Sequence, residues 1–231
     1  DDHTKGLVTD LRQIDPGPNT TVLITGTTAA LMDYIALMYR DFPKVIIFVL
    51  ATLYVVLFFL FRSVILPFKA VLMNSMSIFA SYGALVFIFQ QGHLQNLLGF
   101  TALGYTDAVI PILLFCVTFG LSMDYELFLL TRIKEVYSKT QNNSLSVAEG
   151  LQKSGKVITG GSLILVVASG SFVLGDVVIT KSLGLGIAVA IFIDATIVRA
   201  LLVPALMKIL GDWNWWCPAF IRGESKEHGH S

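Results

Sequence analysis

The sequence predicts an all-α polytopic membrane bundle of about five transmembrane helices, with a short α/β extramembrane segment at its N-terminus. Of the 231 residues, 55% are hydrophobic and only 14% are charged, and the mean hydropathy is +0.73. Soluble domains carry about one-quarter charged residues, so this chain has too little polar sequence to cover a soluble core. Long apolar runs predict helices here, because lipid offers no partner for unpaired backbone groups.

Residues 1–41 have a soluble composition. The cluster Asp15 to Asn19 predicts a turn, and the alternating, β-branched run Thr20 to Ile24 predicts a strand. A helix capped by Thr27 or Thr28 should follow, since apolar residues then recur at helical spacing. We therefore expect the last strand and helix of an extramembrane domain whose beginning precedes residue 1.

The transmembrane bundle is expected over residues 42–207. Crossing the hydrocarbon core takes roughly 20 residues of helix. Pro43 stands at a helix-start position and Arg62 closes the first span. Between the third and fourth spans, Ser144 to Gln152 is expected to form an amphipathic helix on the membrane surface. The five expected spans are residues 43–62, 70–90, 108–131, 157–175 and 182–204.

Lys and Arg in the short loops predict the orientation of the bundle. Residues 62–69 and 132–156 are basic, whereas residues 90–107 contain no Lys or Arg. The basic loops and the tail 208–231 are therefore expected on the cytoplasmic side of a cell membrane, with the N-terminal segment outside. Three tryptophans fit an aromatic anchor at the inner interface: Trp213, Trp215 and Trp216.

Asp124 is the leading candidate for chemistry. It precedes Arg132 by about eight residues, or ~12 Å at helical rise, so it is expected near mid-membrane, facing the bundle interior. A carboxyl there is costly and usually marks an ion or proton pathway, and exclusion of water favours the protonated form that can load and unload. Tyr125 can hold Asp124 or relay through its hydroxyl. A structural hydrogen-bond pair between helices is the alternative.

Other polar residues of the spans have weaker claims. Asp194 and Arg199 lie in the cytoplasmic half of the fifth span, where a structural ion pair is the favoured interpretation. Glu126 points away from the polar stripe that contains Ser122, and its expected role is only to pair with a basic residue. Four hydroxyl residues are candidates for supporting the Asp124 and Tyr125 pair: Thr118, Ser122, Ser162 and Ser169.

Several functional classes are not expected. The four histidines show no ligand spacing, so no metal is assigned. No Gly-rich phosphate loop is present, so an ion gradient is a better energy source than ATP hydrolysis, and no cofactor is expected. No clustered Lys and Arg suggest nucleic acid. An intramembrane aspartyl protease is disfavoured, because the order is Asp-Tyr and Gly184-Leu185-Gly186 is followed by Ile187 where an aspartate is needed; no enzyme activity is expected.

Residues 119–135, FGLSMDYELFLLTRIKE, closely resemble the signature of the MMPL family, large mycobacterial-type membrane proteins of the resistance-nodulation-division superfamily. Further landmarks within residues 61–70, 194–205 and 211–216 occur in the expected order. The resemblance covers the chain from about Thr21 onward. It implies the C-terminal part of the second repeat: the end of an extracytoplasmic porter-type α/β domain in residues 1–41, then spans eight to twelve.

The resemblance also implies a function. Asp124 and Tyr125 match the family's Asp-Tyr proton relay, which drives export of lipids or other hydrophobic molecules. The implied partners are membrane lipids, a hydrophobic or lipid substrate, and the N-terminal repeat of the same transporter, whose matching pair lies outside this chain. The alternative function is a non-transporting, lipid-sensing or scaffolding membrane module.

Overall fold

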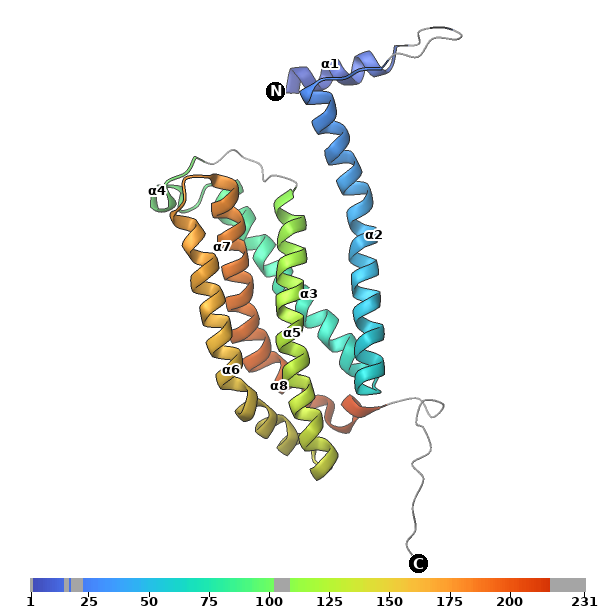
Figure 1. Ribbon diagram of the computed structural model, residues 1–231, viewed down its shortest axis with the longest axis vertical. Helices are drawn as coiled ribbons and strands as arrows, with labels where there is room; N and C mark the ends of the chain where they lie inside the picture. Colours follow the sequence, from blue (N-terminus) through green and yellow to red (C-terminus); the bar gives the residue numbers. More distant parts are fainter. Residues whose placement is uncertain (1, 15–16, 18–22, 102–108, 217–231) are drawn as a thin grey trace, which may run out of the picture. The chain divides into compact units, whose positions relative to one another are not determined.

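The computed structural model describes residues 2–14, 17, 23–101 and 109–216 (Figure 1). Within these ranges the structure is built from helices and contains no strand. The contacts divide the chain into two units, Asp1–Val49 and Leu50–Ser231.

The first unit contains helix α1, Asp2–Arg12, and the start of helix α2, Thr27–Phe61. The Arg12 guanidinium donates two hydrogen bonds to the Asp33 carboxylate, at 2.6 and 2.8 Å. This pairing joins the two helices of the unit.

The expected α/β character of the N-terminal segment is not supported. Residues 20–22 of the expected strand lie outside the described residues, while Leu23 and Ile24 have no strand structure. A strand needs a neighbour to pair its backbone groups, and no other described residues of the chain supply one. Helix α1 was not expected from the sequence.

Helix α2 continues through Pro43, where the sequence predicts a boundary between two helices. Proline has no N–H, so the Tyr39 carbonyl lacks its helical donor. Tyr39 is 63% exposed, which leaves this turn open to other hydrogen-bond donors.

The second unit holds the rest of the bundle. Helix α3, Ile65–Leu85, ends in a π-helical turn η1, Val86–Gln90, and a short helix α4, Gln95–Leu98, follows. Helices α5, Val109–Thr140, and α6, Asn143–Ser171, are joined by a tight turn, and η2, Phe172–Leu174, is a 3₁₀ turn. The last segment is α7, Val178–Ile193, the π-helix η3, Asp194–Leu202, α8, Val203–Leu210, and the 3₁₀ turn η4, Gly211–Trp215.

Among the described residues, five helices are long and apolar enough to cross a membrane, as the sequence predicts. They are Thr27–Phe61, Ile65–Gln90, Val109–Thr140, Asn143–Leu174 and Val178–Trp215. The surface helix expected at Ser144 to Gln152 is instead the first part of α6. Its N-terminus is capped by the Asn142 side chain, which accepts a hydrogen bond from the Leu145 N–H at 3.0 Å, as N-cap residues do.

Helices α5, α6 and α7 pack along one another and α3 packs on α5 and α7 (Figure 1). Glycines determine how closely the backbones of α5, α6 and α7 approach one another. A Cβ on Gly150 of α6 would lie 2.9 Å from the Ile133 Cα of α5, and one on Gly184 of α7 would lie 2.6 Å from the Ser169 carbonyl oxygen of α6. Glycine is therefore required where these backbones touch, which is typical of helix packing in membranes.

Candidate functional site: a buried charge network

Asp194 and Arg199 form an ion pair inside the second unit, and each residue is only 3% exposed. Both belong to η3. A π-helix closes its hydrogen bonds between residues five apart, so Asp194 and Arg199 can face each other from one element. Pro204 follows, and its missing N–H removes a hydrogen bond from the preceding turn, which favours the wider winding.

Serine hydroxyl groups from two neighbouring helices donate hydrogen bonds to the Asp194 carboxylate. Ser77 of α3 donates to Asp194 Oδ1 at 3.3 Å, and Ser122 of α5 donates to Asp194 Oδ2 at 2.8 Å. Arg199 Nη2 donates to the Ser122 carbonyl at 2.6 Å and to the Ser122 Oγ at 2.9 Å. The Ser122 Oγ also lies 2.6 Å from Asn74 Oδ1. A hydroxyl carries one hydrogen, so Ser122 donates to Asn74 or to Asp194 at any moment.

Tyr125 adjoins this network. The Arg199 guanidinium carbon lies 5.1 Å from the centroid of the Tyr125 ring, a cation–π geometry. A cavity of about 10 Å³ is lined by Tyr125, Ser122, Asp194 and Arg199 together with three apolar side chains. That volume is about the minimum for one water molecule. The cavity can therefore hold a single water between the phenol and the ion pair.

Asp124 lies on the side of α5 opposite to Ser122 and the charge network. Its side chain is exposed, whereas Ser122 and Glu126 are buried. At 100° per residue, Ser122 and Glu126 lie about 40° apart on one face, so the expectation that Glu126 points away from Ser122 is wrong, and Asp124 lies about 160° from each of them. The described part of the chain therefore leaves the Asp124 face of α5 open, although the sequence analysis expects that side chain to face the bundle interior.

The remaining candidates fall into three groups. Ser122 joins the charge network, as described above. Thr118 and Ser162 are buried, and neither hydroxyl has a hydrogen-bond partner among the described residues. Ser169 is half-buried, and its carbonyl packs against α7 at Gly184.

Some members of the network were missed by the sequence analysis. Asn74 and Ser77 are each 1% exposed, and Ser81, which is fully buried, donates to the Gly186 carbonyl at 2.7 Å. Their spacing of three and four residues places all three on one face of α3. That polar stripe within an apolar span was the signal that could have identified them.

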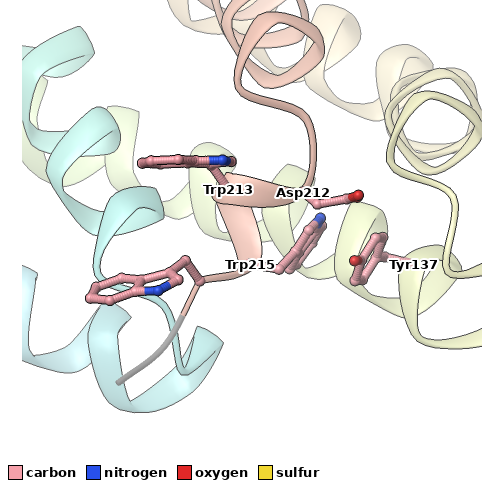
Figure 2. Close-up of a pocket in the computed structure, with 5 residues that line it drawn as sticks. Tyr137, Asp212, Trp213 and Trp215 are labelled. Carbon is pink, nitrogen blue, oxygen red and sulfur yellow. The ribbon is translucent and has the colours of Figure 1, made fainter. Parts of the chain in front are cut away.

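A second concavity lies where α5 and the C-terminal turn η4 meet, away from the charge network. Figure 2 shows Trp215 beside Tyr137, and their rings stack with centroids 4.1 Å apart and planes 10° from parallel. The Trp215 indole donates to Asn143 Oδ1 at 3.1 Å. The pocket, about 530 Å³, is lined by Tyr137, Asp212, Trp213, Trp215 and Trp216.

No group of three His, Cys, Asp or Glu side chains in the described part of the chain is arranged to hold a metal ion. The charge network offers carboxylate, guanidinium, phenol, amide and hydroxyl groups.

Comparisons with a family model and with individual proteins point to the same family. The MMPL family model matches residues 1–227. The chain is 42% identical over 205 residues to the mycolic acid-containing lipids exporter MmpL11 of Mycolicibacterium smegmatis, covering 89% of this chain and 21% of that protein. It is 39% identical over 215 residues to the trehalose monomycolate exporter MmpL3 of Mycobacterium tuberculosis, covering 93% and 23%.

A third relative carries a different functional name. The chain is 41% identical over 198 residues to the heme uptake protein MmpL11 of Mycobacterium tuberculosis, covering 86% of this chain and 20% of that protein. The chain thus spans about a fifth of the length of these three relatives.

Proposed function

Because the chain belongs to the MMPL family and is a multi-pass membrane protein, we propose that it forms part of an exporter of lipids or other hydrophobic molecules driven by the proton-motive force. Two relatives are named as exporters of mycolic acid-containing lipids and of trehalose monomycolate. The substrate class proposed here follows those names.

The observation that carries the proposal is the ion pair of Asp194 and Arg199, buried next to Tyr125. Charged side chains inside a membrane bundle are costly, and they usually mark an ion or proton pathway. Here the pair is linked through Ser122 to α5, the helix that carries Asp124 and Tyr125. A change of protonation at the Asp-Tyr pair can therefore act on a charge network that joins three elements of the bundle.

In this proposal Asp124 and Tyr125 are the proton relay. The Tyr125 hydroxyl packs against Gly161 of α6, and the small cavity beside the Tyr125 ring supports a water-mediated link toward Asp194. Asp124, on the open face of α5, is proposed to meet the N-terminal repeat of the same transporter. That contact would exclude water from the carboxyl, which favours the protonated form needed for loading.

The orientation follows the same proposal. The basic connections at residues 62–69 and 132–156 would face the cytoplasm, as would the segment 208–231, and residues 1–41 would lie outside the cell membrane. The stacked Trp215 and Tyr137 would then lie at the inner interface, where aromatic side chains are enriched.

The test is proton flux into liposomes that contain the full transporter, followed with an enclosed pH-sensitive dye under an imposed membrane potential. Asp124→Asn and Tyr125→Phe should each reduce the flux at least tenfold and abolish translocation of trehalose monomycolate. Asp176→Asn is the matched control, because Asp176 is an exposed carboxylate in the turn after α6. Native flux and lipid translocation in Asp124→Asn would refute the relay, whereas a native transporter that moves no lipid would favour a lipid-sensing module.

A further inference from the structure

Glu126 of α5 and Lys69 of α3 are buried in the second unit, with 2% and 4% of their surfaces exposed. Neither Glu126 Oε1 nor Lys69 Nζ has a hydrogen-bond partner among the described residues. They are the only carboxyl oxygen and ammonium nitrogen among the described residues to be buried in this way. The proposed relay uses neither group.

A buried carboxylate without hydrogen bonds is unfavourable, and in a membrane the surrounding lipid cannot solvate it. Two things relieve the cost. An opposite charge nearby stabilises the ionised form, and a bound proton removes the charge. The Lys69 ammonium supplies the opposite charge, because it is the main favourable charge that faces Glu126. A proton bound to Glu126 would remove the charge altogether.

The charged groups that face Glu126 come from α3 and η3. Lys69 and Arg199 attract its carboxylate, and Asp194 repels it. With all four groups ionised, two positive and two negative charges balance. One added proton gives the cluster a net charge of plus one. Protonation of Glu126 therefore changes the electrostatic field at the Asp194 and Arg199 pair.

The two carboxyls of this cluster differ in their hydrogen bonds. Asp194 receives donors from three side chains, Ser77, Ser122 and Arg199, whereas Glu126 has a hydrogen-bonding interaction with Asn74 and its Oε1 receives no donor from the described residues. Donors to a carboxylate favour its ionised form. A proton that enters the cluster is therefore better accommodated on Glu126 than on Asp194.

We propose that Glu126 is a second proton-binding carboxyl of the bundle, with Lys69 as the counter-charge that keeps its empty state accessible. Uptake forms an O–H bond on Glu126 and raises the charge of the cluster by one; release breaks that bond and restores neutrality. The proposal rests on the proton-coupled function above. It adds a carboxyl on the buried face of α5, opposite to Asp124 and about half a turn closer to Arg132.

The competing explanation is a static ion pair that only stabilises the fold. The test compares three variants of the full transporter in liposomes: Glu126→Gln, Lys69→Met and the double variant. Glu135→Gln is the control, because Glu135 is an exposed carboxylate of the same helix that pairs with Arg132 and Lys139. Infrared difference spectra across a pH titration report the carbonyl stretch of protonated carboxyls.

We expect Glu126→Gln to lose one component of the titrating band, a component that the native protein and Glu135→Gln both keep. Lys69→Met should shift the same band to higher pH, since loss of the cation disfavours the carboxylate. The double variant should keep the native unfolding temperature within a few degrees and lose proton flux at least tenfold. A titrating band left unchanged by Glu126→Gln, or native flux in the double variant, overturns the proposal.

Two further measurements keep the outcomes distinct. If Glu126→Gln does not fold, Glu126→Asp retains a carboxyl, so its band should move in frequency; an unchanged band overturns the proposal. Asp124→Asn separates this proposal from the proposed function. Lost flux in Asp124→Asn with native flux in the double variant refutes only the role of Glu126, whereas native flux in Asp124→Asn refutes the relay itself.

Discussion

Arg199 lies over the ring of Tyr125, with 5.1 Å between the guanidinium carbon and the ring centroid, while its Nη2 is paired with Asp194. One cation thus contacts both the residue beside Asp124 and a carboxylate of the last membrane helix. Changes on α5 and changes on η3 are coupled through this side chain. We therefore expect substitutions in this network to change the stability of the bundle as well as transport.

Replacing Arg199 with methionine should destabilise the bundle strongly. The change leaves Asp194 buried without its counter-charge, and breaking a buried pair in this way typically costs about 3–5 kcal/mol. Arg132→Met removes an exposed pair with Glu135, and should cost less than about 1 kcal/mol. Denaturant titration of the two purified variants compares them, and equal losses would contradict the assigned burial.

Ser122→Ala should lower the free energy of unfolding by about 1–3 kcal/mol, because Asp194 and Arg199 each lose a buried partner. Ser171→Ala is the control, since the Ser171 hydroxyl is exposed and donates only to the Ala168 carbonyl of its own helix. Thermal unfolding monitored by intrinsic fluorescence should separate the two variants. A loss confined to Ser171→Ala would argue against the network.

Adjacent glycines of α6 offer a test of the Tyr125 position. A Cβ on Gly161 would collide with the Tyr125 hydroxyl, whereas a Cβ on Gly160 meets no atom within 4 Å. Gly160→Ala should stabilise the helix by up to about 1 kcal/mol, from helix propensity alone. Gly161→Ala should displace the phenol, lower the unfolding temperature and reduce proton flux. Similar behaviour of the two alanine variants would refute the contact.

Lys181→Met should loosen the connection that contains α4. The Lys181 ammonium donates to the Leu98 carbonyl at 2.6 Å and to the Gly99 carbonyl at 3.2 Å, and so satisfies groups at the C-terminus of α4 that the helix leaves unpaired. Amide hydrogen exchange of residues 95–101 should become at least tenfold faster, whereas Lys156→Met, on the exposed surface of α6, should leave it unchanged.

The membrane helices could be predicted because length and composition determine them. An apolar run of roughly 20 residues has few alternatives to a helix in lipid, and each of the five predicted spans overlaps one of the five long helices of the described residues. Their ends were less predictable. The sequence suggests a break at Pro43, yet α2 continues through it, since a single proline removes one hydrogen bond from a long helix.

The buried charge network was only partly predictable. Hydropathy and helical spacing identify Asp194 and Arg199 as charged residues of the last span, but at 100° per residue two positions five apart lie about 140° from each other. Their contact depends on the π-helical winding of η3, and Pro204 favours that winding without determining it. Of the strand expected at Thr20 to Ile24, the described residues Leu23 and Ile24 have no strand structure, because strand formation depends on a distant partner.

The winding of η3 also determines how the chain responds to a deletion. A π turn holds about one residue more than an α turn, so removal of one residue between Asp194 and Arg199 would restore ordinary α-helical phasing while preserving every charged side chain. The carboxylate and the guanidinium would then be four residues apart, about 40° from each other at 100° per residue, so they would still face one another. At this point of the chain the helix can lose one residue and keep its buried pair, whereas in an ordinary α-helical stretch such a deletion rotates everything that follows by about 100°.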